Sequence, residues 1–344
     1  MTLKPFLEVK NLNVAFPTED GLVQASNDIS FSVARGETLA VVGESGSGKS
    51  VTSLAVMGLH DRKRTQITGQ AFLNLETGPV DVISADEEVV RKLRGKAMSM
   101  IFQDPMSALH PYYSIGNQLI EAWSLYNEGD KAAGKKRAIE MLDLVGIPDA
   151  TKRVDEFPHQ FSGGMRQRVM IAMALMNSPR LLIADEPTTA LDVTVQAQIL
   201  ALLAKLKKEF DMGILLITHD LGVVAQVADR VSVMYGGQIV EEAPVDNLFY
   251  SPMAPYTLGL LKSVPRVTAN NERLKAIPGQ PPSLINLPKG CAFSTRCEYK
   301  SLASVDCDTV PVPLTSAGTH HQARCHIPAD VRSEKFLKEV AGLK

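Results

Sequence analysis

The chain has 344 residues, of which 45% are hydrophobic and 22% are charged, so it is long enough for two or three packed domains and too apolar to be disordered. Its 36 basic and 38 acidic residues give a formal charge of −2. That balance lacks the excess of positive charge that binding to nucleic acid or directly to an anionic membrane requires, so we expect no nucleic-acid partner.

The sequence also lacks the features of membrane insertion and secretion. No run of residues approaches the about 18 apolar positions of a membrane-spanning helix. The start, Met1-Thr2-Leu3-Lys4-Pro5, lacks the apolar core of a secretory signal. We therefore expect a cytoplasmic protein without disulfides, which takes part in any membrane process through a partner.

Hydrophobic patterning predicts an α/β fold whose first 110 residues are rich in short strands. The expected strands are Phe6–Val9, Ile29–Val33, Thr38–Val42, Ala71–Leu75, Val80–Ile83 and Met98–Phe102, with one helix after Ser50. From about 111 to 176 the pattern becomes helical, as in Lys135–Val145, which predicts a helical subdomain inserted into the sheet core.

Strand patterning then returns at Leu181–Ala184 and Ile214–Thr218, on either side of a helical pattern over Val195–Phe210. A strand, a helix and a strand in this order predict a parallel βαβ unit. The paired glycines Gly236-Gly237 supply the positive φ of a tight turn and predict a β-hairpin between Val231–Tyr235 and Gln238–Val240.

Prolines and cysteines mark the end of the chain as a separate part. Seven prolines between Ser251 and Gly290 predict an extended, poorly helical linker on a surface. All four cysteines lie in the last 54 residues. We therefore place a first domain at residues 1–265, with its helical subdomain at about 111–176, and a cysteine-containing extension at residues 266–344.

A glycine-rich segment, Gly43-Glu44-Ser45-Gly46-Ser47-Gly48-Lys49-Ser50, fits the pattern G-x-x-x-x-G-K-S and follows an apolar strand. Its glycines let backbone N–H groups surround the phosphates of ATP, and the following helix directs its positive end at them. Lys49 neutralises phosphate charge, and Ser50 can ligate Mg²⁺. The residues expected to bind nucleotide are Gly43, Ser45, Gly46, Gly48, Lys49 and Ser50.

A second phosphate-related motif is the apolar strand Leu181–Ala184, which ends abruptly in Asp185 and Glu186. The carboxyl end of a buried strand is where α/β folds place ligand chemistry. Asp185 would hold the magnesium shell, and Glu186 would act as the general base for the water that attacks the γ-phosphate. An acidic loop after a core strand is the alternative interpretation.

Over about residues 5–250 the chain resembles the nucleotide-binding subunits of ABC transporters. Ser162-Gly163-Gly164 resembles the ABC signature, and a helix that begins there would offer its amides to a phosphate. Phe161 and Met165 stand where the widest consensus carries Leu and Gln, but the phosphate-facing groups are kept. An ordinary turn is the alternative.

The resemblance implies roles for four further residues. Gln103 matches the Q-loop glutamine that faces magnesium, and His219 matches the switch histidine that contacts the γ-phosphate. Asp192, in Ala190-Leu191-Asp192, matches the D-loop between two nucleotide sites, and Phe16 stands where an aromatic ring stacks on adenine. The alternatives are an exposed amide for Gln103, a structural histidine for His219, a helix N-cap for Asp192 and core packing for Phe16.

In the family, the signature of one subunit covers the phosphate loop of another, so a single copy of each motif implies a dimer. ATP holds the two surfaces together, and its hydrolysis releases them. Coupling to a membrane partner would pass through the helical insertion between Gln103 and Ser162. The apolar and aromatic groups of residues 104–113 in this insertion suit either a docking groove or core packing.

The four cysteines, Cys291, Cys297, Cys307 and Cys325, are spaced x5, x9 and x17, which is not the spacing of a zinc ribbon. The segments at residues 251–261, 278–282 and 290–293 resemble the C-terminal extension of oligopeptide and dipeptide importer ATPases. Members with four such cysteines bind a [4Fe-4S] cluster, which the resemblance implies here. Zinc and free thiols remain the alternatives.

The resemblance implies a P-loop NTPase core with an antiparallel β subdomain, and a subunit that hydrolyses ATP to power the import of oligopeptides or dipeptides. Its implied partners are a homologous ATPase subunit, two transmembrane permease subunits and, indirectly, an extracytoplasmic peptide-binding protein. It implies a peripheral location at the cytoplasmic face of the plasma (inner) membrane. The alternatives are a nickel, antimicrobial-peptide or oligosaccharide importer, a non-transport ABC ATPase, and a regulatory module without hydrolysis.

Overall fold

The structure is a computed structural model that describes residues 5–104, 108–128, 130–189, 191–264 and 276–341. The chain divides into two compact units. Unit 1 comprises Met1–Leu7, Val33–Glu37 and Phe72–Leu216, and unit 2 comprises Glu8–Ser32, Thr38–Ala71 and Ile217–Lys344. The predicted boundary at residue 265 falls on the first of the undescribed residues 265–275 and stays a prediction.

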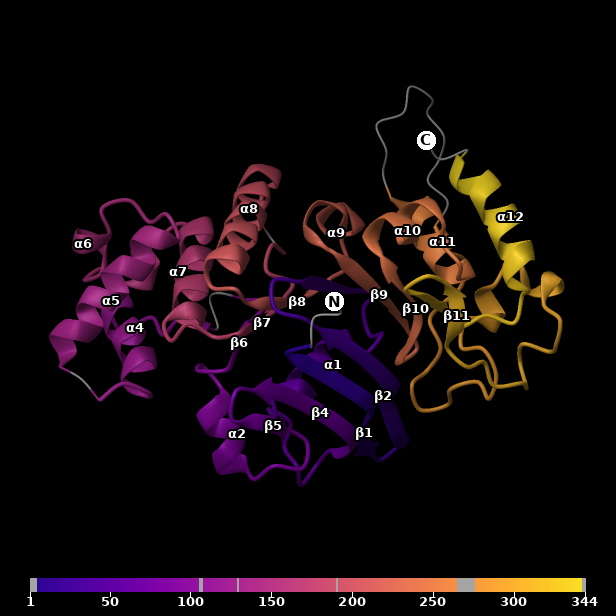
Figure 1. The fold of residues 1–344 in the computed structure, drawn as a ribbon, viewed down its shortest axis with the longest axis horizontal. Coiled ribbons are helices and arrows are strands. Elements are labelled where there is room, and N and C mark those ends of the chain that lie inside the picture. Colours follow the sequence, from indigo (N-terminus) through magenta and orange to yellow (C-terminus); the bar gives the residue numbers. More distant parts are fainter. Residues whose placement is uncertain (1–4, 105–107, 129, 190, 265–275, 342–344) are drawn as a thin grey trace. The chain divides into compact units, whose positions relative to one another are not determined.

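Unit 1 combines short strands with the predicted group of helices, α4 to α7, which lie together in Figure 1. Its elements are β5 (Gly78–Asp81), α2 (Glu87–Leu93), β6 (Met98–Ile101), α4 (Ile115–Ser124), α5 (Lys131–Leu144), α6 (Ala150–Arg153), η1 (Pro158–Gln160), α7 (Gly163–Leu175), β7 (Leu181–Asp185), α8 (Val193–Glu209) and most of β8 (Gly213–Thr218). Strands β6 and β7 pair in parallel, from Met98 opposite Leu181 to Ile101 opposite Ala184. All residues of β6 and β7 are buried, as the apolar sequence pattern predicts.

Unit 2 contains the remaining strands and the C-terminal helices. Its elements are β1 (Leu7–Thr18), β2 (Gly21–Val33), β3 (Thr38–Val42), α1 (Lys49–Val56), β4 (Gln66–Leu75), α9 (Leu221–Val227), β9 (Arg230–Tyr235), β10 (Gln238–Pro244), α10 (Val245–Tyr250), α11 (Pro255–Ser263), η2 (Ser294–Arg296), η3 (Lys300–Leu302), β11 (Thr315–Gly318), β12 (His321–Ala323) and α12 (Ala329–Ala341). Within this unit, β11, β12, β10, β9 and β3 are successive neighbours in one sheet. Strand β3 pairs with β9 in parallel, and β9 pairs with β10 antiparallel.

The predicted hairpin is confirmed. Gly236 and Gly237 join β9 to β10 with φ values of 55° and 75°, which is the left-handed geometry that two-residue hairpin turns require. Strand β10 then continues into the cysteine extension, because it pairs antiparallel with β12 through Glu241 opposite Ala323. The extension thus adds two strands, β12 and β11, to a sheet that also contains β3.

The expectation of a poorly helical segment between residues 251 and 290 is wrong in its first part, which forms helix α11. Pro255 occupies the first turn of this helix, where the missing N–H of proline costs nothing, and no further proline follows before Ser263. From 276 to 290 the chain has neither helix nor strand, as predicted. There the carbonyl of Leu284 accepts a hydrogen bond from the backbone N–H of Gln24 at 2.9 Å.

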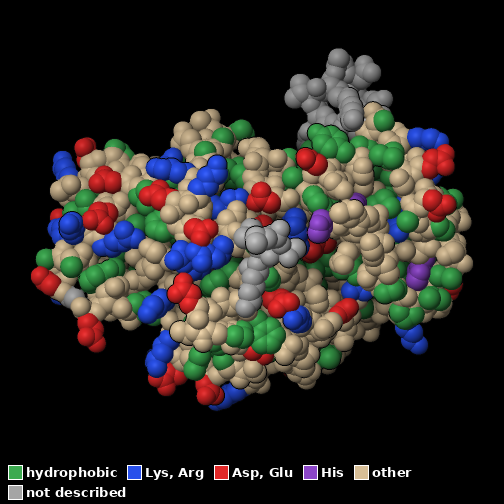
Figure 2. Space-filling view, in the orientation of Figure 1, with side chains coloured by type: hydrophobic (Ala, Val, Ile, Leu, Met, Phe, Trp, Pro, Cys, Tyr) green, Lys and Arg blue, Asp and Glu red, His purple; other side chains and the backbone are tan. Residues whose placement is uncertain are grey.

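The surface carries charges of both signs. Over the helices α4 to α7, basic and acidic side chains are interspersed on the face shown in Figure 2. Such mixing agrees with the near-neutral balance of the composition. Among the described residues, none of the helices is long and apolar enough to cross a lipid bilayer.

A buried polar contact joins the extension to the sheet of unit 2. The Glu241 side chain is 0% exposed and lies 2.7 Å from Nε2 of His321, which is 4% exposed. The Glu241 carboxylate also accepts hydrogen bonds from the backbone N–H groups of Met253 and Ala254, at 2.6 and 2.8 Å. One carboxylate therefore anchors β12 and the segment that leads into α11.

Replacing Glu241 by alanine should destabilise the protein strongly, because three buried donors lose their acceptor at once. We expect a loss of about 3–5 kcal/mol in the free energy of unfolding, measured by urea titration. The control is Glu334→Ala, which removes an exposed ion pair with Lys338 and should change that free energy by less than about 1 kcal/mol. Equal stability of the two variants would show that Glu241 is no anchor.

Candidate functional site

The glycine-rich loop of unit 2 connects β3 to α1 and lies against the backbone of two strands. A Cβ atom at Gly43 would lie 2.1 Å from the carbonyl oxygen of Met234, and a Cβ atom at Gly48 would lie 2.1 Å from that of Ala25. Both glycines have positive φ, 154° and 102°. Only glycine meets both requirements, so the loop conformation depends on these two positions.

The crest of the same loop is open. Ser45 and Gly46 are exposed, and a Cβ atom at Gly46, which has a φ of 76°, would meet no atom within 4 Å. Ser50 is exposed in the first turn of α1, a helix whose N-cap is Gly48. The loop thus presents exposed backbone next to a helix N-terminus, an arrangement that binds phosphate in many proteins.

Lys49 folds back over the loop that precedes it. Its ammonium group donates hydrogen bonds to the carbonyl oxygens of Gly43 and Glu44, both at 2.9 Å, and lies 3.4 Å from Oγ of Ser47. The residue is 7% exposed. Lys49 therefore places a positive charge inside the curve of the loop, where a polyphosphate would be neutralised.

Two other predicted residues of unit 2 occupy strand ends or edges. Phe16, in β1, is half-buried and packs edge-to-face against His60, with the ring centroids 5.5 Å apart. His219 is exposed directly after β8, and the carboxylate of Asp220 caps α9 by accepting hydrogen bonds from two backbone N–H groups. Both placements agree with partial exposure to a ligand, whereas stacking on adenine and contact with a γ-phosphate stay predictions.

In unit 1, two predicted residues that are 83 positions apart meet. The amide nitrogen of Gln103 donates a hydrogen bond to the Glu186 carboxylate at 2.8 Å, and the hydroxyl of Thr189 donates to the same oxygen at 2.9 Å. Glu186 has a φ of 47°, which is unfavourable for a residue with a side chain. The turn after β7 therefore holds this carboxylate in a strained position, as is frequent at functional sites.

Asp185, the last residue of β7, is 8% exposed and precedes Glu186 at the carboxyl end of the strand. The two carboxylates occupy different environments, one in the buried strand and one in the turn. Thr189 was not among the predicted residues. Its hydroxyl lies three positions after Glu186, a spacing that could have indicated a local hydrogen bond.

The predicted signature begins a helix. Ser162 caps α7 by accepting a hydrogen bond from the N–H of Met165 at 3.3 Å. A Cβ atom at Gly164 would lie 2.8 Å from Val195 of α8, so helix packing explains that glycine. A Cβ atom at Gly163 would meet no atom of the described residues within 4 Å, so packing against them does not require glycine there.

Asp192 caps α8, because its carboxylate accepts hydrogen bonds from the N–H groups of Thr194 and Val195, both at 3.0 Å. The capping alternative is therefore present in the structure, and a contact between two nucleotide sites stays a prediction. Ala190 of the same motif lies outside the described residues, as do residues 105–107 of the predicted docking segment. In the described part of that segment, Tyr112 and Tyr113 are 84% and 56% exposed.

All four cysteines of unit 2 are free thiols and line one cavity together with Tyr256, Phe293 and Ile327. Burial raises the pKa of Cys291 to about 11 and that of Cys297 to about 12. Burial also raises the pKa of Cys307 and of Cys325. The thiols are consequently protonated at neutral pH unless a bound cation displaces their protons.

A single metal ion does not fit this arrangement. Within the described residues, no group of three or more His, Cys, Asp or Glu side chains is arranged to hold one. The cavity nevertheless brings together four sulfur atoms from residues 291 to 325, which the sequence could not place relative to one another. Soft sulfur donors in an apolar surrounding are the ligand type of iron–sulfur clusters.

Comparison with known proteins adds family relationships to this geometry. Residues 26–189 match the family described as ABC transporter, and residues 240–303 match the family described as oligopeptide/dipeptide transporter, C-terminal region. The oligopeptide transport ATP-binding protein OppD of Bacillus subtilis is 52% identical over 321 residues, covering 92% of this chain and 87% of that protein. OppD of Escherichia coli is 49% identical over 324 residues, which is 94% of each chain.

A solved structure is similar in fold. It is the dimeric post-hydrolysis structure of the ATP-binding cassette MJ0796 bound to ADP and Pi, which matches with a TM-score of 0.61 and 26% sequence identity. The match covers 70% of this chain and 98% of the MJ0796 chain. The fold and the motif residues thus define an ABC-type ATPase. Within that class, the chain belongs to the family of oligopeptide transport ATP-binding proteins.

Substitution can distinguish a loop glycine that is needed for close packing, Gly48, from one that is needed only for its backbone conformation, Gly46. Gly46→Ala adds only the cost of a left-handed backbone, about 1–2 kcal/mol. Gly48→Ala adds the collision with the carbonyl of Ala25, so it should lower the free energy of unfolding by about 1–3 kcal/mol more than Gly46→Ala. Urea unfolding of both variants measures the difference, and equal losses would contradict the close packing at Gly48.

Proposed function

We propose that this chain is the ATP-hydrolysing subunit of a membrane importer for oligopeptides or dipeptides. The observation that carries the proposal is the contact between Gln103 and Glu186, since two separate motifs assign these residues to hydrolysis. The shape of the phosphate loop and the similarity to OppD proteins support it. The peptide cargo rests on the printed names of those relatives, because no described residue needs to touch a peptide.

In this proposal, Ser50, Asp185 and Gln103 hold Mg²⁺ through oxygen atoms, the donor type that this ion prefers. The ion would neutralise charge on the phosphates during their transfer. Lys49 and the loop amides bind the β- and γ-phosphates, and Phe16 stacks on adenine. Gly43, Ser45, Gly46 and Gly48 let the loop backbone approach the ligand.

Glu186 accepts the proton of the attacking water in this mechanism, and Gln103 and Thr189 orient its carboxylate. His219 senses the γ-phosphate. Ser162, Gly163 and Gly164 cover the nucleotide of a second, homologous ATPase subunit, with Asp192 at the contact between the two sites. The open space at Gly163 supports this role, because glycine there would let a group from outside the chain approach the backbone closely.

The proposed assembly places the ATPase pair beneath two transmembrane permease subunits, at the cytoplasmic face of the plasma (inner) membrane. A binding protein outside the cell would deliver the peptide. The exposed Tyr112 and Tyr113 support a docking surface for a permease near the end of residues 104–113. The near-neutral charge supports attachment through protein contacts rather than through anionic lipid.

Glu186→Gln should bind ATP with unchanged affinity but lower the rate of phosphate release by about 10²–10⁴-fold, because the general base is lost. Steady-state phosphate release and nucleotide binding of the purified subunit measure the two effects. Glu140→Gln, which alters an exposed acid on α5, is the matched control and should keep full turnover. A near-normal rate in Glu186→Gln would refute the assigned base.

For the extension, we propose that Cys291, Cys297, Cys307 and Cys325 bind a [4Fe-4S] cluster. The convergence of all four thiols on one apolar cavity supports it. The lack of a site for a single ion does not oppose it, because the cysteines of a cluster bind different iron atoms. The cluster would supply a covalent link between segments of the extension and a redox-active centre.

Protein purified without oxygen should contain about four iron atoms per chain and absorb visible light. Cys297→Ser should lose most of both signals, whereas Ser301→Ala, at an exposed position of the same extension, should keep them. Metal analysis and absorbance spectra provide the measurement. Colourless wild-type protein without iron, or protein with one zinc ion per chain, would overturn the assignment.

A further inference from the structure

Arg296 is a buried cation of the cysteine extension whose hydrogen bonds leave the extension. It lies in the short helix η2, between Cys291 and Cys297, and its side chain is 5% exposed. A buried guanidinium group needs partners for its five N–H donors, since unpaired donors would be costly. Its partners therefore indicate what this residue holds in place.

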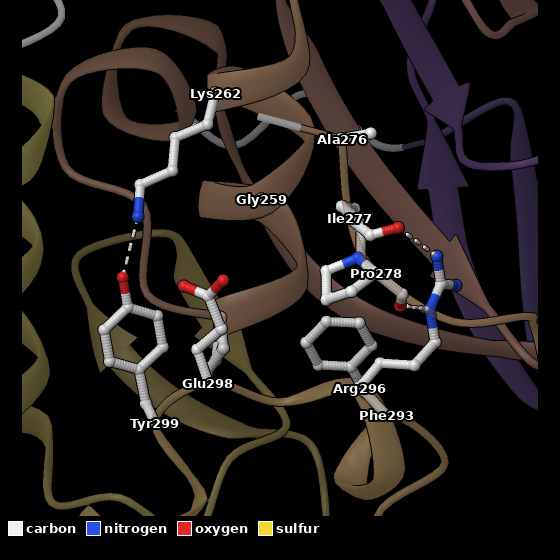
Figure 3. Close-up of a pocket in the computed structure, with 10 residues that line it drawn as sticks. Gly259, Lys262, Ala276, Ile277, Pro278, Phe293, Arg296, Glu298 and Tyr299 are labelled. Atoms are coloured by element: carbon white, nitrogen blue, oxygen red, sulfur yellow. Dashed lines mark hydrogen bonds between the residues drawn. The ribbon is translucent and has the colours of Figure 1, made fainter. Parts of the chain in front are cut away.

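All five donors have acceptors. Nε donates to the carbonyl of Pro278 at 2.8 Å, and Nη2 donates to that of Ile277 at 3.3 Å; both contacts are drawn in Figure 3. Nη1 donates to the hydroxyl of Tyr235 at 3.2 Å. The remaining two bonds go from Nη1 and Nη2 to the two carboxylate oxygens of Glu44, at 2.8 and 3.1 Å.

Glu44 is the second residue of the phosphate loop. Its N–H donates to the hydroxyl of Tyr256 at 2.9 Å, and its carbonyl oxygen accepts the hydrogen bond from Lys49 at 2.9 Å. Arg296 therefore holds, through both oxygens of one carboxylate, the residue on which the phosphate-binding lysine rests. Paired bonds of this kind fix orientation as well as distance, which a lysine could not reproduce.

The same contact is connected to the cysteine cavity. Phe293 and Tyr256 line that cavity, and their ring centroids are 5.3 Å apart. Phe293 also accepts the backbone hydrogen bond of Arg296 at 3.0 Å. Tyr256 and Phe293 thus line the cavity and also contact Glu44 and Arg296, respectively.

We propose that Arg296 is a positioning residue for ATP, which holds the phosphate loop in its binding conformation through Glu44. The cysteine extension thereby becomes part of the nucleotide site, although it need not contact the nucleotide. This inference rests on the proposed ATPase function. The rival explanation is that Arg296 only fastens the extension to the rest of unit 2.

The two explanations differ in what happens to ATP affinity. Arg296→Lys and Glu44→Gln should each raise the Kd and the KM for ATP about tenfold and change kcat at saturating ATP by less than about twofold, because the loop is mispositioned before binding. The double variant should be no weaker than the worse single variant, since both changes break one interaction. Titration with a fluorescent ATP analogue and steady-state kinetics on the full chain measure these values.

Arg324→Lys is the matched control. Arg324 is also a buried arginine of the extension, 8% exposed, and it pairs with Asp28 at 3.0 Å, outside the phosphate loop. The Arg324→Lys substitution should lower the thermal stability of the protein without changing the Kd for ATP. Iron content and thermal unfolding of every variant, measured alongside, separate loss of the extension from loss of loop position.

Wild-type affinity in Glu44→Gln, or multiplying effects in the double variant, would overturn the proposal. If Arg296→Lys does not fold, Glu44→Gln alone decides, because this substitution breaks the same interaction from the side of the loop and replaces no residue of the extension. Wild-type protein that binds no ATP would instead refute the proposed function. The failures of the two proposals are therefore distinguishable.

Discussion

The phosphate loop lies directly on the backbone of two strands from different sheets, β2 and β9, and the nucleotide-binding unit depends on that close approach. No side-chain atom can be added at Gly43 or Gly48 without meeting a carbonyl oxygen at 2.1 Å. Ser45 and Gly46 at the crest stay exposed, while Lys49 folds back onto the carbonyl oxygens of Gly43 and Glu44. This arrangement of positive groups is suited to bind a ligand with several negative charges.

In unit 1 the candidate site contains a strained backbone at Glu186, whereas in unit 2 the phosphate loop depends on close packing. Glu186 keeps an unfavourable backbone conformation, and two hydrogen bonds fix its carboxylate. In the proposed mechanism, a carboxylate that is already oriented would lose little freedom on accepting a proton from water. The two signature glycines also differ: Gly164 is needed for packing against Val195, whereas packing against the described residues does not require glycine at position 163.

Local patterns predicted much of the fold and most of the candidate site. The loop at residues 43–50, the hairpin at Gly236-Gly237 and the strand before Asp185 each depend on a few consecutive residues, so the sequence displays them. Helix α11 was not predicted, because the many prolines of this segment indicated an extended chain, although Pro255 lies in the first helical turn, where proline is favourable. The contact between Arg296 and Glu44 could not be predicted, because no periodicity relates residues that meet only through tertiary folding.

The contact of Arg296 with Glu44 joins residues 252 positions apart, one near the start of the chain and the other near its end. A ribosome that adds about 5–20 residues per second makes the second residue roughly 13–50 s after the first. During that interval the nascent chain has a phosphate loop without its ionic partner. The Arg296–Glu44 contact can therefore form only after the C-terminal extension has been synthesised, so an incomplete chain lacks this support of the phosphate loop.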